Sequence, residues 1–302
     1  MNILLLGGTG FLGKKCAKEL CKNHKVIVTG LTDDNGFDNE FNCYNIPIQE
    51  TESLIALIKN NKIDVVMHFI SSLIPSSDID KYFFDLQYIY IPTQHLLEFC
   101  SKNNIKFVYI SSGGAVYGNQ CEVFSEDTKR EPASYYGLSK LNFENLILFY
   151  HNMFNLNYMI LRPSNPYGTG QNLYGKQGLI AVIIGKIISG DPIEIWGDGT
   201  AVKDYIYIDD FTYYVSQLLI LRKSWNNIYN IGSGIGSSIK DVLEAFKKNN
   251  ITLPNIIYSS DYKSDVKHMI LNCSKLQEVI PHNCISLVEG IKQFYDNSFK
   301  NS

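Results

Sequence analysis

The chain has 302 residues, of which 45% are apolar and 19% charged, an ordinary balance for a globular protein of one or two domains. Its net charge of −3 provides no basic field for a nucleic acid or an anionic membrane surface, so we expect neither as a partner. Apolar runs such as Leu218–Leu221 and Val182–Ile184 are far too short to span a bilayer.

The chain opens with a strand, a glycine turn and a helix. Asn2–Leu6 has the length of a buried parallel strand, and the run Gly7-Gly-Thr-Gly-Phe-Leu-Gly13 leads from it into a helix expected over residues 14–22. Dinucleotide binding requires this order, because Gly7 permits the turn, Gly10 lets the backbone approach the pyrophosphate, and Gly13 lets the helix pack closely. The helix N-terminus supplies N–H groups and partial positive charge for the phosphates. A glycine-rich loop without a ligand is the weaker alternative.

Strands and helices then alternate, which predicts an α/β fold with a doubly wound, Rossmann-type parallel sheet. We expect further strands over 25–29, 64–70, 106–111 and 158–162, and helices over 51–59, 80–103 (bent at Pro92) and 134–154. Beyond Pro163 the pattern is looser, with helices expected over 178–189, 209–222 and 238–248 and a strand over 193–196. We therefore expect a dinucleotide-binding domain over 1–165 and a smaller C-terminal α/β lobe over 166–302, with segments near 203–232 returning to the first lobe.

Tyr136 and Lys140 are four residues apart on the helix expected over 134–154, so they share one face, one turn apart. A free phenol titrates near pH 10, and an ammonium beside it favours the phenolate. Such a pair can move a proton on or off a sugar hydroxyl while a hydride leaves or returns. The spacing alone is common on helix surfaces, and its place downstream of a dinucleotide-binding turn makes it specific.

The seven cysteines are an odd number without C-x-x-C spacing, which favours a reducing cytosol over a disulfide framework. None has the spacing of metal ligands, so the sequence predicts no metal site. The N-terminus carries no positively charged segment ahead of its apolar run, and we expect no secretory signal. These features indicate a cytoplasmic protein.

Further motifs follow in order along the chain: Ser111-Ser-Gly-Gly-Ala-Val-Tyr-Gly118, Arg162-Pro-Ser-Asn-Pro-Tyr-Gly168, Ile195-Trp-Gly-Asp-Gly199, Lys203-Asp-Tyr-Ile-Tyr-Ile-Asp-Asp210 and Asn230-Ile-Gly-Ser-Gly234. Together with the glycine turn and the Tyr136/Lys140 pair, they make the chain resemble the extended short-chain dehydrogenase/reductases, and among these the nucleotide-sugar epimerase/dehydratase branch that includes UDP-glucose 4-epimerase. The resemblance implies a Rossmann domain that holds NAD or NADP and a smaller lobe that grips a nucleoside diphosphate sugar.

The resemblance also implies roles for single residues. The tyrosine that matches Tyr136 is the acid/base of the family, and the lysine that matches Lys140 binds the nicotinamide ribose and lowers the pKa of the phenol. Asn165 and Lys203 match residues against the substrate diphosphate; for Asn165 a turn-forming role is an equal alternative, and Lys203 lacks the bidentate fork of the arginine that relatives often carry. Cofactor contacts are expected from Gly7, Gly10, Phe11, Leu12, Gly13, Phe69, Ser111, Tyr136, Lys140 and Pro163.

The chain departs from the family beside the catalytic tyrosine. Relatives carry a serine or threonine two residues after Ser111, hydrogen-bonded to the sugar hydroxyl, and this chain has Gly113 there. We expect the Ser112 hydroxyl to make this hydrogen bond to the sugar in place of the missing side chain, which puts Ser112 in the catalytic group. Ser111 and an ordered water are the alternatives. Dehydratases of this branch carry Asp-Glu where this chain has Gly114-Ala115, so dehydration is not expected.

A second departure lies at the end of the second strand. Members that prefer NAD place an acid there for the adenosine ribose, whereas this chain has Gly30, and Asp33 and Asp34 follow three to four residues later. No arginine stands ready for a 2′-phosphate. The sequence leaves NAD and NADP open and slightly favours NAD.

Two reactions fit these residues. One is nucleotide-sugar 4-epimerisation through a 4-keto intermediate, with reversible hydride transfer to bound NAD. The other is reduction of a 4-keto NDP-deoxy sugar by NAD(P)H. A catalytically idle nucleotide-binding protein is a third reading, against which the intact Tyr136/Lys140 pair argues. Relatives dimerise through two long helices that match 80–103 and 134–154, so a homodimer is expected.

Overall fold

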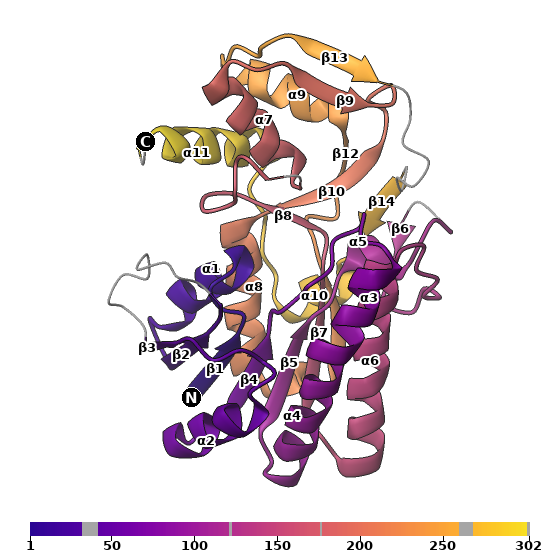
Figure 1. Ribbon diagram of the computed structural model, residues 1–302. Helices are drawn as coiled ribbons and strands as arrows, with labels where there is room; N and C mark the ends of the chain where they lie inside the picture. The colour runs from indigo at the N-terminus through magenta and orange to yellow at the C-terminus, as the bar shows by residue number, and fades with distance from the viewer. Residues whose placement is uncertain (32–41, 121–122, 176, 260–267, 301–302) are drawn as a thin grey trace. The chain divides into compact units, whose positions relative to one another are not determined.

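The computed structural model of the protein describes residues 1–31, 42–120, 123–175, 177–259 and 268–300. Its largest sheet has seven strands in the order β11-β7-β5-β4-β1-β2-β3 (Figure 1). The pairings of β1 with β2 and β4, of β2 with β3, and of β5 with β4 and β7 are all parallel. This confirms the Rossmann-type sheet. The strands are β1 (Asn2–Leu6), β2 (Lys25–Thr29), β3 (Asn42–Tyr44), β4 (Val65–His68), β5 (Lys106–Ile110), β7 (Tyr158–Pro163) and β11 (Asn227–Ile231).

The register of this sheet brings the predicted motifs to one edge. Leu6 at the end of β1 pairs with His68 at the end of β4, and His68 pairs with Tyr109 in β5. Because these strands are parallel, the segments that follow them leave the sheet at the same edge, where α/β proteins bind ligands. Those segments begin at Gly7, Phe69 and Ser111.

Helices cover both faces of the sheet. One face buries Leu4, Leu6 and Phe107 in a cluster with apolar side chains of α2 (Thr51–Asn61), α4 (Ile91–Lys102) and α6 (Tyr135–Phe154). The other face is covered by α1 (Phe11–Leu20) and α8 (Ile208–Ile220) (Figure 1). Residues of β1 alternate between the two faces, which is why its buried residues, Ile3 to Leu6, are all apolar.

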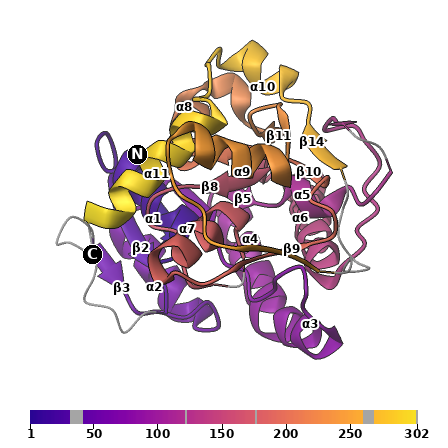
Figure 2. The same cartoon turned by 90° about the horizontal axis from the view of Figure 1, so that it is seen from above.

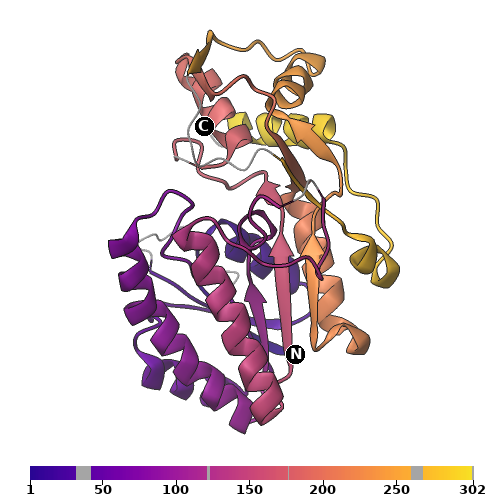
Figure 3. The same ribbon diagram turned by 90° about the vertical axis from the view of Figure 1, so that its right-hand side faces the viewer.

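The helix predicted over 80–103 is three segments, α3 (Ile79–Asp85), a π-helical turn η1 (Leu86–Tyr90) and α4. The N–H of Ile91 bonds the Leu86 carbonyl, five residues back, just before Pro92. Pro92 has no N–H to continue the regular ladder, so the irregularity precedes it. Figure 3 shows this composite helix beside α6 along one face of the sheet.

Helix α6 begins one residue later than predicted because Ser134 is its N-cap. The Ser134 hydroxyl accepts a hydrogen bond from the N–H of Gly137 at 3.1 Å. The helix ends at Asn155, which takes the left-handed conformation with φ 56°. The short helix α5 (Gly113–Val116) packs against α6, and the sequence did not predict it.

The described chain divides into two compact units. Unit 1 comprises Met1–Gly118, Lys129–Arg162 and Thr212–Tyr229, and unit 2 comprises Asn119–Thr128, Pro163–Phe211 and Asn230–Ser302. Within the described residues, no helix combines the length and apolar character that crossing a membrane requires.

Unit 2 is built on small sheets that the sequence largely failed to predict. One has β12, β10, β14 and β6 in that order, with β8 also paired to β10, and a second joins β13 to β9. Figure 2 shows α9 and α11 side by side. The strands of these sheets are β6 (Val123–Phe124), β8 (Asn165–Tyr167), β9 (Ile193–Trp196), β10 (Val202–Tyr207), β12 (Gly236–Ser238), β13 (Ile256–Ser259) and β14 (His268–Leu271). The helices of unit 2 not yet given are α7 (Leu179–Ser189), α9 (Ile239–Lys248), α10 (Ser274–Val279) and α11 (Leu287–Lys300). The short segment η2 (Arg222–Ser224) belongs to unit 1.

Candidate active site

The glycine turn has the geometry that its sequence predicts. Gly7 lies in the left-handed region with φ +72°, and its carbonyl accepts a hydrogen bond from the N–H of Gly10 at 3.2 Å. A Cβ on Gly13 would lie 2.6 Å from the Cα of Gly8, so only glycine lets α1 approach the turn this closely.

Gly10 differs from the other two glycines because protein packing does not require it. A Cβ at this position would meet only the Gly7 carbonyl oxygen, at 3.6 Å, and Gly10 is exposed. The bare backbone therefore leaves room for a ligand rather than for another part of the chain. Gly10 also caps α1 without a side-chain hydrogen bond, and the first turn holds no acidic residue. This uncapped helix start suits a diphosphate, so the residues present fit a dinucleotide.

The segment after β4, which begins at Phe69, runs beside the glycine turn. The N–H of Phe69 bonds the Leu6 carbonyl at 2.9 Å, and a Cβ on Gly7 would lie 2.8 Å from Cγ1 of Ile70. Phe11, Leu12 and Phe69 are half-buried, which leaves part of each side chain accessible, whereas Pro163 at the end of β7 is buried.

The side chain of Thr9 packs against Gly30, directly after the end of β2. A Cβ on Gly30 would collide with the Thr9 hydroxyl and lie 2.9 Å from the Thr9 Cβ, so Thr9 occupies the space beside Gly30. Asp33 and Asp34, which the sequence offers as ribose ligands, lie outside the described residues.

Ser112 and Tyr136 come together at the start of α5 and α6. A hydrogen bond from the Ser112 hydroxyl favours the phenolate of Tyr136, although burial is the larger effect and raises the pKa of Tyr136 above its usual value. The resemblance implies a lowered pKa, and the protein alone does not provide it. Tyr136 as a whole residue is half-buried. Gly113, at the first position of α5, is buried directly beside Ser112.

Lys140 lies one turn along α6 from Tyr136, with its Nζ 5.7 Å from the centroid of the Tyr136 ring. The ammonium donates a hydrogen bond to the Ile110 carbonyl at 2.9 Å. Burial lowers the pKa of Lys140 to about 8, against the charges of Asp85 and Glu144, which raise it. The Lys140 ammonium is thus held near the Tyr136 ring by its hydrogen bond to Ile110, the last residue of β5.

Glu144, a second turn along the same helix face, forms a buried ion pair that sequence reasoning missed. Arg162 donates to its carboxylate from Nε at 2.9 Å and from Nη2 at 2.6 Å, and both side chains are at most 1% exposed. The Ser111 hydroxyl donates to the same carboxylate at 2.5 Å, and Arg162 also donates to the Tyr117 hydroxyl at 2.7 Å. Ser111 is therefore engaged in this network, which leaves Ser112 as the hydroxyl beside Tyr136. The four-residue spacing from Lys140 to Glu144 was the available signal.

Asp85 is the second buried carboxylate near Lys140. Its oxygens accept hydrogen bonds from Ser72 and, at 2.5 Å, from Ser139. Ser139 precedes Lys140 in α6, so Asp85 fixes the composite helix to the segment that carries the Tyr/Lys pair. No sequence spacing pointed to Asp85, because its partner lies 54 residues away.

His68 at the end of β4 packs in the core and stays neutral. Burial, followed by the charge of Lys140, lowers the pKa of His68 to about 3. Its Nε2 lies 3.1 Å from the Thr93 hydroxyl, and its ring packs among Phe107, Tyr109 and Phe143. Since the Thr93 hydroxyl donates to the Ile89 carbonyl, it accepts from His68.

In unit 2, the residues predicted to hold a diphosphate lie on paired strands. Asn165 is in β8 rather than in a turn, and its amide donates to the Asp204 carbonyl at 2.8 Å. Lys203 precedes Asp204 in β10 and is half-buried. The Asp204 carboxylate is buried and accepts from the N–H and hydroxyl of Ser233 at 2.9 and 2.7 Å, which ties the Asn230–Gly234 motif to β10.

These residues divide into two groups. Unit 1 brings together the glycine turn, Phe69, Ser111, Ser112, Gly113, Tyr136 and Lys140 at one edge of the parallel sheet or on the helix starts beside it. Unit 2 holds Asn165 in β8 and Lys203 in β10, two strands that pair with each other. Chemically, unit 1 offers a dinucleotide cradle and a phenol with one hydroxyl and one ammonium beside it. That set supports proton transfer coupled to hydride transfer.

Residues 3–232 match the protein-family model described as the NAD dependent epimerase/dehydratase family. The chain is 30% identical to a putative UDP-glucose 4-epimerase of Methanocaldococcus jannaschii, over 96% of each chain. It is 31% identical to a dTDP-4-dehydro-6-deoxyglucose reductase of Escherichia coli, over 82% of each chain. The UDP-glucose 4-epimerase of Thermotoga maritima, solved with UDP-glucose, superposes with a TM-score of 0.91 at 29% identity, covering 100% of this chain and 99% of that one.

Proposed function

Because the chain belongs to the NAD-dependent epimerase/dehydratase family, we propose that it is a nucleotide-sugar 4-epimerase. The reaction passes through a 4-keto intermediate, and NAD supplies the reversible hydride acceptor. Epimerases among the similar proteins, one of them solved with UDP-glucose, support a UDP-sugar as the substrate. Gly114-Ala115 provides no carboxylate, so dehydration is not part of the proposal.

The observation that carries this proposal is the hydrogen bond between Ser112 and Tyr136, with the Lys140 ammonium near the same phenol ring. Tyr136 removes the proton of the C4 hydroxyl as the hydride leaves C4, and it returns the proton after the hydride reaches the other face of the 4-keto sugar. Burial alone raises the pKa of the phenol, so the Ser112 hydrogen bond and the Lys140 ammonium are the groups of this chain that favour the phenolate.

We assign substrate and cofactor contacts by the same reasoning. The glycine turn, Phe69, Ser111 and Pro163 line the dinucleotide, and Lys140 binds its nicotinamide ribose. Lys203 neutralises the substrate diphosphate, and Asn165 donates the amide N–H that does not bond Asp204 to the same group. The match to the NAD dependent epimerase/dehydratase family favours NAD over NADP as the cofactor.

A 4-keto reductase of an NDP-deoxy sugar is the second candidate, and the similarity to a dTDP-4-dehydro-6-deoxyglucose reductase favours it. Both reactions use Tyr136 and Lys140 in the same way. They differ in the fate of the cofactor, since an epimerase regenerates its cofactor in each turnover and a reductase consumes one equivalent.

Two assays distinguish the epimerase from the reductase. The purified protein is given UDP-glucose or UDP-N-acetylglucosamine without added cofactor, and the products are analysed for the 4-epimer. An epimerase converts many equivalents. Stoichiometric oxidation of added NADPH by a 4-keto sugar nucleotide, without epimerisation, would replace the proposal with the reductase.

We propose that the protein forms a homodimer through the composite α3–η1–α4 helix and α6. These helices expose large apolar side chains that the core does not use: Phe83, Phe84, Tyr88, Ile91, Phe149, Met153 and Phe154. Light scattering should give a dimer mass, and Phe84→Glu with Phe149→Glu should give a folded monomer. A wild-type monomer at micromolar concentration would exclude this interface.

We also propose a cytoplasmic location. No disulfide links the six cysteines that the structure describes, as a reducing compartment allows. Fractionation of cells that express the tagged full chain tests this assignment.

A further inference from the structure

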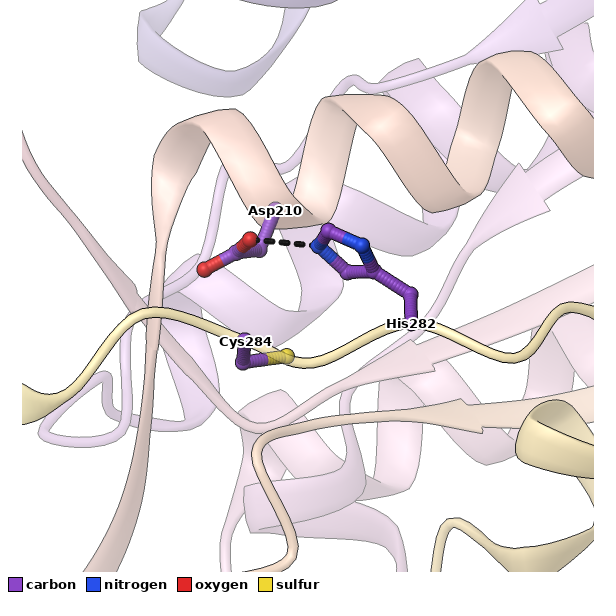
Figure 4. A group of neighbouring side chains, drawn as sticks. All are labelled: Asp210, His282 and Cys284. Carbon is purple, nitrogen blue, oxygen red and sulfur yellow. Dashed lines mark hydrogen bonds and ion pairs between the residues drawn. The ribbon is translucent and has the colours of Figure 1, made fainter.

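A group of potential metal ligands in unit 2 stands apart from the residues assigned to catalysis. Asp210 lies in the first turn of α8, and His282 and Cys284 lie in the segment between α10 and α11 (Figure 4). One ligand atom from each residue lies within 4.8 Å of the others. No sequence spacing indicates this group, because Asp210 is 72 residues from His282.

The ligand atoms of Asp210 and His282 lie slightly closer together than two ligands of a bound zinc ion would. Oδ1 of Asp210 and Nε2 of His282 are 2.7 Å apart. Zinc bonds of about 2.0 to 2.3 Å in tetrahedral geometry place ligand atoms roughly 3.3 to 3.8 Å apart. Binding therefore requires Oδ1 of Asp210 and Nε2 of His282 to move slightly apart.

The surroundings of the group hold its ligands in place. The second oxygen of Asp210 accepts the N–H of Ile285 at 3.1 Å, which orients the carboxylate so that Oδ1 faces His282. Gln277 bonds the backbone of His282 on both sides, from Nε2 to the carbonyl at 2.9 Å and from the N–H to Oε1 at 3.1 Å. Such bonds to the ligands and their backbone are the support that metal sites in proteins use.

Burial and donor chemistry point to a transition metal rather than to calcium or magnesium. The side chain of Asp210 is 6% exposed and that of His282 26%, so the site is shielded and still reachable. Calcium and magnesium prefer oxygen ligands, whereas imidazole and thiolate together select zinc.

We propose that Asp210, His282 and Cys284 bind one Zn²⁺ ion that fastens the first turn of α8 to the segment before α11. Three protein ligands leave one tetrahedral position for a water or a ligand atom. Binding releases the proton of the Cys284 thiol to solvent. A neutral His282 moves its single proton from Nε2 to Nδ1, so that Nε2 coordinates as an imidazole nitrogen. The bond between His282 and Asp210 gives way to two metal bonds.

The experiment uses full-length protein purified without a metal-affinity tag and treated with a chelator. Co²⁺ is titrated first, because a thiolate–cobalt charge-transfer absorption reports the sulfur ligand directly. Zn²⁺ is then titrated by calorimetry, and proton release is measured in buffers of different ionisation enthalpy. We expect about one equivalent per chain, with Cys284→Ser abolishing the absorption and His282→Gln weakening Zn²⁺ binding at least about tenfold.

Cys43→Ser is the matched control, because Cys43 is an exposed thiol in unit 1 and should leave the titrations unchanged. Thermal unfolding without metal establishes that Cys284→Ser and His282→Gln are folded. Absence of saturable binding by the wild type, or binding that neither variant weakens, would leave only an Asp210–His282 hydrogen bond and overturn the proposal. Epimerase activity is not a readout, so failure here is independent of the proposed function.

Discussion

Gly137 lies against Ala115 where the first turn of α6 meets α5. A Cβ on Gly137 would collide with the Ala115 carbonyl oxygen and lie 2.9 Å from the Cβ of Pro132. The glycine that follows Tyr136 therefore allows the close approach that brings the phenol to Ser112. The Tyr-x-x-x-Lys spacing sets the helix face, and this glycine sets how near that face comes to the serine.

Gly137→Ala should separate the two helix starts. We expect a loss of stability of about 1 to 3 kcal/mol from overpacking, and at least about a tenfold loss of turnover because Ser112 no longer reaches Tyr136. Urea denaturation and steady-state kinetics measure the two effects. Gly175→Ala is the control, since a Cβ there meets its nearest neighbours at 3.6 Å. Equal turnover in both variants would mean that the close approach does not serve catalysis.

Tyr136→Phe should lower turnover at least about a hundredfold while the dinucleotide stays bound, because the phenol carries the proton. Turnover is measured by product analysis and bound nucleotide by mass spectrometry of the purified variant. Unchanged turnover would remove Tyr136 from the mechanism.

Ser112→Ala and Ser111→Ala distinguish the two adjacent hydroxyls. Removing the Ser112 hydroxyl should cost on the order of tenfold or more in kcat, because it takes away a hydrogen bond to the phenolate. Removing the Ser111 hydroxyl should mainly lower stability, by about 1 kcal/mol, because it bonds the buried Glu144. The reverse pattern would assign the hydroxyl at the sugar to Ser111.

Glu144→Gln should destabilise the fold by about 3 to 5 kcal/mol, since it leaves the Arg162 charge buried without its partner. Arg130 also contacts Glu144, at 3.4 Å, but its side chain is 31% exposed. Arg130→Gln should therefore cost less than about 1 kcal/mol. Chemical denaturation of both variants tests the contrast, and similar losses would argue against the buried pair as the stabilising contact.

The sequence could predict the parts of the site that local patterns determine. The Gly7–Gly13 turn, the end of β4 and the Tyr136/Lys140 spacing each follow from a strand, a turn or a helix period. The Rossmann sheet followed from the alternation of these elements. Within unit 2 the short strands β8, β10, β12 and β14 were missed, because none of them contains a run of four apolar residues like the one that identifies β1.

Contacts between distant segments could not be predicted. Asp85 meets Ser139, and Asp210 meets His282, only because the fold brings together segments more than 50 residues apart. The pKa of Tyr136 differs from expectation for a related reason: the resemblance implies a lowered pKa, whereas burial raises it. Spacing places an ammonium near the phenol, but the cost of burying the phenolate depends on everything packed around it.

Lys140 should make stability depend on pH in a direction that its lowered pKa fixes. In the folded protein this pKa is about 8, whereas an unfolded lysine titrates near 10.4. Between these values the unfolded chain binds the proton and the folded chain does not. The free energy of unfolding therefore rises with pH across this window, by up to about 1.4 kcal/mol per pH unit.

Lys140→Met removes that titration and keeps a side chain of similar size. Urea denaturation of both proteins in the same cofactor state at pH 7, 8 and 9 gives the difference in their free energies of unfolding. We expect the wild type to gain stability relative to the variant above pH 8 and to show little relative change below it. Catalysis should fall in the variant at pH 7, where Lys140 of the wild type is mostly charged, because the ammonium beside Tyr136 is lost. Parallel stability curves would mean that Lys140 titrates as an ordinary lysine and that burial does not perturb its charge.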